Sequence, residues 1–273
     1  MMLACNHITL AVDGRALCRD LAFTVKPGEV WGVLGPNGGG KTTLLNVLAG
    51  LAAPASGSVT LDDQALAAMP AVARARAVGV LPQHEESEFW GSALEYVSLG
   101  CFPHAQVRSA WLGWQPEDEA TAHGALQRVG MAEFAARRYA TLSGGERQRV
   151  RIAQLLAQSP RFLLLDEPLQ HLDLRYQMQM LDLVKALAQD DKPGRGVVMV
   201  LHDVLWPTRV CTHALLLDGA GGALAGAADA VLTQKNLESL FGCVLQPAGD
   251  NPQAGFVPAG TDGFQPRVII RAS

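Results

Sequence analysis

The sequence lacks the features that mark membrane-spanning, secreted and nucleic-acid-binding proteins. No uncharged apolar run is long enough to cross a bilayer, and residues 1–7 lack the basic start and apolar stretch of a signal peptide. With 22 Lys and Arg against 26 Asp and Glu, the net charge is −4, which provides no basic excess to attract nucleic acid. These absences predict a protein that stays in the cytosol and reaches a membrane only through a partner.

Cysteine pairs and internal repeats are also absent. The five cysteines are scattered without a C-x-x-C spacing, so we interpret them as reduced, packed side chains rather than as metal ligands or disulfides. No solenoid-type repeat is present. What remains, 49% hydrophobic and 18% charged residues in a chain of 273, is typical of one large globular domain or two modest ones.

One glycine-rich stretch carries the strongest chemical signal. GPNGGGKTT, at 35–43, matches the phosphate-binding pattern G-x-x-x-x-G-K-[ST], with a strand pattern before it and a helix pattern after it. Its glycines let backbone N–H groups surround an anion, and the helix start adds a positive dipole end. We expect Lys41 to bridge the β- and γ-phosphates and Thr42 to ligate Mg²⁺. A plain glycine turn before a core helix is the weaker interpretation. The predicted nucleotide contacts here are Gly35, Pro36, Asn37, Gly38, Gly39, Gly40, Lys41, Thr42 and Thr43.

Two adjacent carboxylates end a later apolar strand pattern, Phe162-Leu-Leu-Leu-Asp166. A strand end near a phosphate loop is where a Mg²⁺-binding aspartate is needed, and Asp166 fits that position. Glu167 follows directly and is placed to polarise the attacking water. A solvated strand end is the alternative interpretation, and the upstream loop disfavours it.

The segment LSGGE, at 142–146, begins a predicted helix over 147–158. Ser143 and Glu146 have the spacing of a capping box, which is a sufficient structural explanation for both. Gly144 and Gly145 are poor helix formers, however, and are better explained if an anion approaches the backbone there. A second anion-binding helix end predicts a nucleotide shared between two copies of the chain.

A histidine and a glutamine end two further strand patterns. A lone histidine is usually a packing or surface residue, but at the end of a parallel strand in a nucleotide-binding core we expect His202 to contact the γ-phosphate. Gln83 is a weaker candidate for the Mg²⁺ or water network. Arg147, Arg149 and Arg151 are interpreted as a solvated helix face, because no aromatic residues alternate with them.

Strand and helix patterns divide the chain into a core and an insert. Alternation around Asp13-Gly14 predicts two antiparallel strands within 3–25. Later continuous apolar runs are typical of strands covered on both faces of a parallel sheet. The intervening residues 84–158 are mostly helical in pattern, with a tryptophan-bearing irregular stretch at 87–113.

The order of these motifs strongly resembles the ATP-binding subunit of ABC transporters over about residues 3–245. The matching motifs are GPNGGGKTT, Gln83, LSGGE, LLLDEP, HLDL and Leu-His-Asp. The resemblance implies ATP and Mg²⁺ as ligands and a head-to-tail dimer, in which each ATP lies between one copy's phosphate loop and the other copy's LSGGE. It also implies that Gln83 links the site to the membrane subunits and that Glu167 is the catalytic base. Asp173 would lie in the loop joining the two sites, and His202 would be the switch histidine.

The fold implied by this resemblance is α/β, with a P-loop NTPase (RecA-like) core, an antiparallel β subdomain and an inserted α-helical subdomain. The expected boundaries are 1–83 and 159–245 for the core, 84–158 for the helical subdomain, and 246–273 for a C-terminal tail of unassigned role. Catalysis would combine positioning with charge neutralisation by Lys41, Mg²⁺, the Ser143 helix end and His202.

Finer features resemble the importer branch that serves iron–siderophores, haem and vitamin B12. These are HLDLRYQ after DEP, the segment Gly100–His104, and the ending at 231–242. The implied partners are membrane permease subunits and, indirectly, a substrate-binding protein, at the cytoplasmic side of the inner membrane. Alternatives are an exporter's cassette or a soluble ABC ATPase acting on ribosomes or DNA, which usually has two cassettes or long coiled coils.

Two departures from the family pattern stand out. Val12 occupies the place where many relatives carry an aromatic residue that stacks on adenine, which predicts loose base selectivity. Leu169-Gln170 replaces the usual small polar pair after DEP, at the expected dimer seam.

Overall fold

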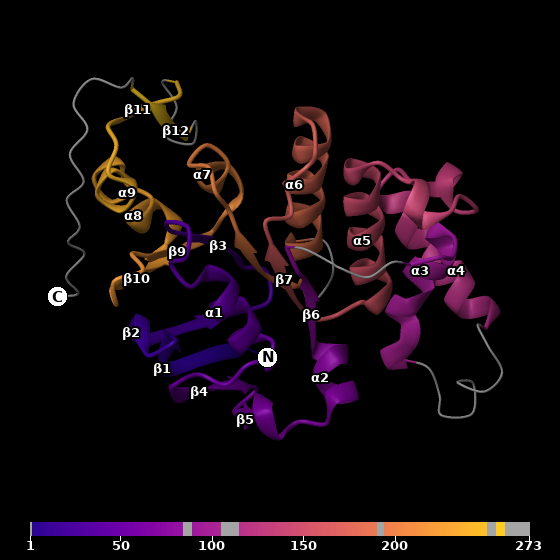
Figure 1. Ribbon diagram of the computed structural model, residues 1–273, viewed down its shortest axis with the longest axis horizontal. Helices are drawn as coiled ribbons and strands as arrows, with labels where there is room; N and C mark the ends of the chain where they lie inside the picture. The colour runs from indigo at the N-terminus through magenta and orange to yellow at the C-terminus, as the bar shows by residue number, and fades with distance from the viewer. Residues whose placement is uncertain (1, 84–88, 105–114, 190–193, 250–254, 260–273) are drawn as a thin grey trace.

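The computed structural model describes residues 2–83, 89–104, 115–189, 194–249 and 255–259. Two sheets and a group of helices make up most of this structure (Figure 1). The strands come mainly from the first third and the last half of the chain, and the helical group comes from the residues between them. This arrangement confirms the predicted α/β core with an antiparallel sheet and a helical insert.

The antiparallel sheet forms the N-terminal side of the molecule. Its strand order is β2-β1-β4-β5. The strands are β1 (Leu3–Val12), β2 (Arg15–Val25), β4 (Ser56–Leu61) and β5 (Gln64–Ala65). Asp13 and Gly14 join the first two strands with backbone φ angles of 49° and 77°. Such left-handed pairs favour Asp or Asn followed by Gly, and this explains why the turn was predictable from two residues.

The main sheet has the order β10-β9-β3-β8-β7-β6. Five strands are parallel, and β10 pairs antiparallel with β9 at the edge. The strands are β3 (Val30–Leu34), β6 (Val78–Leu81), β7 (Phe162–Asp166), β8 (Gly196–Val200), β9 (His213–Leu217) and β10 (Ala223–Ala227). Every residue of β3, β7 and β8 is buried, as the continuous apolar runs predict.

Different cores cover the two faces of this sheet. Helix α1 (Lys41–Leu48) and the antiparallel sheet pack on one face, against Leu164 and Val198. Helix α6 (Leu174–Gln189) and the helical group pack on the other, against Leu163 and Val197. Because neighbouring strand residues point to opposite faces, each buried strand contributes to both cores.

The helical group contains an ordered element that the sequence did not predict. Helix α3 (Ala93–Ser98) and the 3-10 helix Leu99–His104 lie within the stretch expected to be irregular. Ser92 and Glu95 form a capping box that begins α3. Trp90 and Phe102 are exposed, whereas Trp111 and Trp114 fall outside the described residues. The other helices of this group are α4 (Pro116–Arg128) and α5 (Gly144–Gln158), with 3-10 turns at Ala132–Phe134 and Tyr139–Thr141. A 3-10 turn at Leu66–Ala68 and helix α2 (Ala71–Ala77) come earlier in the chain, between β5 and β6.

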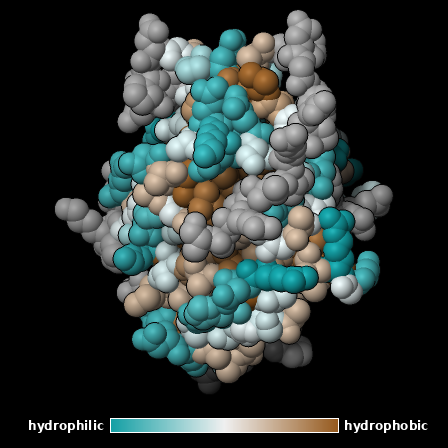
Figure 2. All heavy atoms as spheres, turned by 90° about the vertical axis from the view of Figure 1, so that its left-hand side faces the viewer, coloured by the Kyte–Doolittle hydropathy of each residue, from teal (hydrophilic) through white to brown (hydrophobic). Residues whose placement is uncertain are grey.

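The C-terminal part adds a third, smaller core. It contains α7 (Pro207–Val210), α8 (Ala228–Val231), α9 (Gln234–Phe241) and a hairpin of β11 (Leu245–Pro247) and β12 (Phe256–Pro258). The hairpin crosses the expected boundary at residue 245. On the face of the molecule that includes α8 and α9, hydrophobic patches are interspersed among hydrophilic residues (Figure 2). Among the residues that the structure describes, no helix combines the length and the apolar character needed to cross a bilayer.

Candidate functional site

The phosphate loop connects β3 to α1, and its glycines are required by space or by conformation. A Cβ atom on Gly35 would overlap the carbonyl oxygen of Leu217 on the neighbouring strand. Gly38 and Gly40 have φ angles of 72° and 95°, which L side chains rarely adopt. Gly40 is also the N-cap of α1, so the loop turns directly into the helix N-terminus. Backbone N–H groups at such a terminus favour an anion.

Lys41 lies folded over this loop. Its ammonium nitrogen donates hydrogen bonds of 2.9 Å to the carbonyl oxygens of Gly35 and Pro36, and the residue is buried. Burial lowers the pKa of Lys41, while the nearby carboxylates of Glu167 and Asp166 act in the opposite direction. The loop therefore presents a largely desolvated cationic group, which binds phosphate more strongly than a solvated one.

Thr42 and Asp166 meet where α1 begins and β7 ends. The Thr42 hydroxyl donates to Asp166 Oδ2 at 2.7 Å. Asp166 is buried, and its Oδ1 has no hydrogen-bond partner among the described residues. Burial raises the pKa of Asp166, and the Thr42 hydrogen bond opposes that shift. A buried carboxylate oxygen without a partner, beside a hydroxyl, fits a hard cation such as Mg²⁺ that takes its other ligands from water and phosphate.

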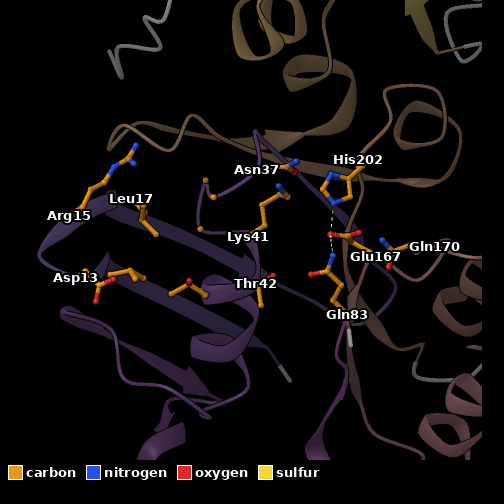
Figure 3. A pocket seen from close by; sticks show the side chains of 15 residues that line it. Asp13, Arg15, Leu17, Asn37, Lys41, Thr42, Gln83, Glu167, Gln170 and His202 are labelled. Atoms are coloured by element: carbon orange, nitrogen blue, oxygen red, sulfur yellow. Dashed lines mark hydrogen bonds and ion pairs between the residues drawn. The ribbon is translucent and has the colours of Figure 1, made fainter. Parts of the chain in front are cut away.

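Glu167, Gln83 and His202 converge beside that pair (Figure 3). Gln83 Nε2 donates to Glu167 Oε1 at 2.7 Å, and His202 Nε2 forms an ion-pair contact with the same oxygen. Glu167 has a φ of 51°, an unfavourable backbone conformation for a residue with a side chain. Such strain concentrates at functional sites. In this structure the Gln83 amide therefore faces Glu167, whereas its expected role toward Mg²⁺ stays a prediction.

A cleft of about 840 Å³ joins these groups and is large enough for a nucleotide. The phosphate loop forms its middle, and the β1–β2 turn and the carboxylate cluster lie at its two ends (Figure 3). Of the residues at the first end, Val12 was singled out from the sequence, whereas Arg15 and Leu17 are identified by their proximity to the loop in space. The lining residues are Val12, Asp13, Arg15, Leu17, residues 37–43, Gln83, Glu167, Gln170 and His202.

The LSGGE segment does not line this cleft in the described part of the chain. Ser143 caps α5: its hydroxyl accepts from the Glu146 N–H at 3.3 Å, and its own N–H donates to Glu146 at 2.7 Å. Ser143 and Gly144 are exposed, so the helix end is accessible to another molecule. Gly145 has an additional packing reason, since a Cβ there would lie 3.1 Å from the His171 carbonyl oxygen.

Asp173 caps the helix that follows the carboxylate strand. Its Oδ1 accepts from the backbone N–H of Tyr176 at 3.1 Å, at the start of α6. His171, two residues earlier, has a φ of 63°. The loop between β7 and α6 therefore turns at His171, whose carbonyl oxygen lies beside Gly145 at the start of α5. This proximity of His171 and Gly145 brings the segment after Glu167 next to the LSGGE helix within one chain.

Arg149 and Arg151 of α5 correct the expectation of a solvated face, whereas Arg147 is exposed. Arg151 is buried and donates to the carbonyl oxygen of Pro82 and to Gln148 Oε1. The Arg149 guanidinium carbon lies 4.0 Å from the centre of the Tyr176 ring. Arg147 is exposed, and its guanidinium donates to the carbonyl oxygens of Ala140 and Leu142, just before α5. Neighbouring elements cover this helix, and charge spacing alone did not reveal that contact.

Comparisons with known proteins agree with this geometry. A family model described as ABC transporter matches residues 18–170. The chain is 40% identical over 251 residues to the hemin import ATP-binding protein HmuV of Bordetella pertussis, covering 89% of this chain and 92% of the relative. It is 38% identical over 261 residues to HmuV of Pseudomonas entomophila, covering 93% of this chain and 97% of that relative.

Solved structures give the same result. A metal-chelate type ABC transporter in an inward-facing conformation is 28% identical, with a TM-score of 0.80 and coverage of 94% of this chain and 97% of the other. The dimeric ABC cassette MJ0796 is 25% identical, with a TM-score of 0.73 and coverage of 83% and 98%. MJ0796 has also been solved as a dimer bound to ADP and phosphate after hydrolysis. The chain thus belongs to the ABC transporter family and is an ATP-hydrolysing cassette of that family.

Proposed function

We propose that this chain drives the import of haem or a related metal chelate, such as an iron–siderophore or cobalamin-type compound, by hydrolysing ATP. The observation that carries the proposal is the match along nearly the full chain to hemin import ATP-binding proteins. The metal-chelate type transporter supports the same substrate class. A bacterial Atm1-family ABC exporter is 24% identical, a likeness that extends to the fold alone and so does not favour the exporter alternative.

The phosphate site would act by positioning and charge. The loop N–H groups and Lys41 would hold the β- and γ-phosphates, and Thr42 and Asp166 would hold Mg²⁺, which supplies further positive charge. Glu167 would orient the attacking water and accept its proton. His202, in contact with Glu167, would stabilise charge on the γ-phosphate. The short distances among these side chains support the assigned roles.

The proposal includes a defined set of partners. A second copy would supply the Ser143 helix end and Asp173 loop to complete each ATP site. Integral membrane permease subunits would bind the cassette at the cytoplasmic side of the inner membrane, and a substrate-binding protein would act indirectly. Within the chain, residues 84–158 would form a helical subdomain, and residues 1–83 and 159–245 would form the core.

Replacing the proposed base tests the chemistry. Glu167→Gln keeps the shape and the Gln83 neighbour but removes the negative charge, so ATP should bind with little change. Turnover should fall about 100-fold or more, in line with the loss of a general base. Glu133→Gln, at an exposed carboxylate in the helical region, is the matched control. Measured steady-state hydrolysis at the normal rate in Glu167→Gln would remove this residue from its proposed role.

Reconstitution tests the import function. The chain should co-purify with a many-helix permease and should accelerate ATP hydrolysis when vesicles carry that permease and its haem-loaded binding protein. Uptake of haem that requires ATP supports the proposal. Association with ribosomes or DNA, without a membrane partner, would favour the soluble alternative.

A further inference from the structure

The last described segment of the chain lies against the loop that carries His202. We define the C-terminal hairpin as β11, β12 and Gly255. The Phe256 N–H donates to the Val204 carbonyl oxygen at 3.3 Å, two residues after His202. Figure 1 shows the hairpin near α7 and α9. The hairpin is therefore in direct contact with the backbone of a catalytic loop.

Gly255 is the closest part of this contact. It is buried, with a φ of 80°, a conformation that L side chains rarely adopt. A Cβ atom there would lie 2.5 Å from the carbonyl oxygen of Leu205 and 2.9 Å from its Cα. Both atoms are backbone and cannot rotate away. Any side chain at this position must therefore displace either the hairpin or the His202 loop.

The hairpin itself has a firm base. Leu245 is 2% exposed and packs in a cluster with Leu34 and Leu216 of the main sheet. Its N–H donates to Glu238 at 2.9 Å, and its carbonyl oxygen accepts from Gln234 at 2.7 Å. These contacts tie β11 to α9. Through β11 the hairpin is thus anchored both to α9 and to the main sheet.

The loop is also held by the main core, where Trp206 is buried and Leu205 packs against the same cluster. The Leu201 N–H donates to the Val33 carbonyl oxygen, and Asp203 accepts from the N–H groups of Leu205 and Trp206. The His202 side chain is 42% exposed, and its Nε2 contacts Glu167 Oε1. Its position consequently depends on how residues 203–206 are held. The hairpin supplies the contacts at Val204 and Leu205.

We propose that the C-terminal hairpin is a positioning element for ATP hydrolysis. Gly255 and Phe256 hold the backbone after His202 so that the imidazole remains at Glu167. The proposal rests on the role proposed above for His202. Because the hairpin does not line the nucleotide cleft, its contribution should affect turnover and leave ATP binding nearly unchanged.

The experiment uses the full chain with Gly255→Ala and Gly130→Ala as a matched pair. Gly130 has a similar φ of 66°, and a Cβ there would lie 3.8 Å from Arg149 Nη1, an ordinary contact, so this control carries a similar backbone strain without a clash. Gly255→Ala should lower kcat by about 10- to 100-fold, the range expected when a reacting group is misplaced by about 1 Å. The Kd for ATP should change by less than about twofold, because the phosphate contacts that set ATP affinity stay intact. Gly130→Ala should keep kcat near that of the unmodified protein.

A double-mutant cycle separates positioning from general loosening. In a His202→Ala background, Gly255→Ala should cause no further loss in single-turnover hydrolysis, since the group that it displaces is gone. An equal loss in both backgrounds, or a normal kcat in Gly255→Ala, overturns the proposal. Full turnover by His202→Ala alone would instead refute the role of the histidine. If Gly255→Ala does not fold, Phe256→Ala removes the ring without a clash and gives the same comparison.

Discussion

At the scale of single residues, the end of the cleft at the β1–β2 turn, where we expect the nucleobase to lie, has no aromatic side chain among its lining residues. Val12, Asp13, Arg15 and Leu17 line it, and none carries an aromatic ring. The Arg15 guanidinium donates to the Gly219 carbonyl oxygen at 2.9 Å, which ties the β1–β2 turn to the turn after β9. Stacking of a base on an aromatic ring is worth about 1–3 kcal/mol in nucleic-acid sites. This end of the cleft can therefore contact a base, but it offers no ring on which the base could stack.

The expected consequence is loose base selectivity. GTP should displace a fluorescent ATP analogue nearly as well as ATP, because the shared triphosphate supplies most of the binding energy. Val12→Tyr should raise the affinity for ATP by about tenfold by restoring a stacking surface. Lys41→Ala should weaken ATP and GTP equally and serves as the control for the phosphate site. A strict preference of the unmodified protein for ATP would contradict the prediction.

At the scale of elements, two helices begin with the same capping chemistry in different surroundings. Ser92 with Glu95 caps α3, and Ser143 with Glu146 caps α5. Hydrogen bonds from Ser143 lower the pKa of Glu146 below its ordinary value of 4.5. The stabilisation from this carboxylate is therefore present above about pH 4.5 and is lost as the pH falls below the lowered pKa.

This pair separates a structural cap from a nucleotide contact. Ser92→Ala and Ser143→Ala should each lower the free energy of unfolding by about 1 kcal/mol at pH 7, the usual cost of losing an N-cap. Only Ser143→Ala should also reduce ATP hydrolysis, since its helix end is the one proposed to reach a second copy's nucleotide. Thermal unfolding and hydrolysis assays on both variants provide the test. Equal effects of the two variants on hydrolysis would reduce Ser143 to a cap.

Elements set by neighbouring residues were predictable from the sequence, and those set by distant contacts were not. The phosphate loop, β7 and the capped start of α5 each depend on a short pattern. Arg151 could not be placed, because its partners at Pro82 and Gln148 include a loop 69 residues away. Helix α3 was obscured by the aromatic residues and glycines around it. The C-terminal hairpin depends on Gly255 meeting Leu205, which no local pattern indicates.

At the scale of the whole molecule, the nucleotide cleft and the Ser143 helix end are separate features of one chain. The cleft brings together Lys41, Thr42, Glu167 and His202, while the exposed Ser143 helix end lies outside it. The similar cassette MJ0796 has been solved as a dimer. A head-to-tail pair would place each helix end opposite the other copy's phosphate loop. Nucleotide would then act as part of the interface, and the pair should separate after hydrolysis.

Dimerisation should therefore depend on bound, unhydrolysed ATP. Glu167→Gln with Mg²⁺ and ATP should elute as a dimer in size-exclusion chromatography with light scattering, and with ADP it should elute as a monomer. Adding Ser143→Arg to this variant should abolish the dimer, because a bulky side chain would block the helix end, whereas Ser92→Arg should leave it intact. A Glu167→Gln protein that stays monomeric with ATP, both alone and with its permease, would contradict a nucleotide shared between two copies.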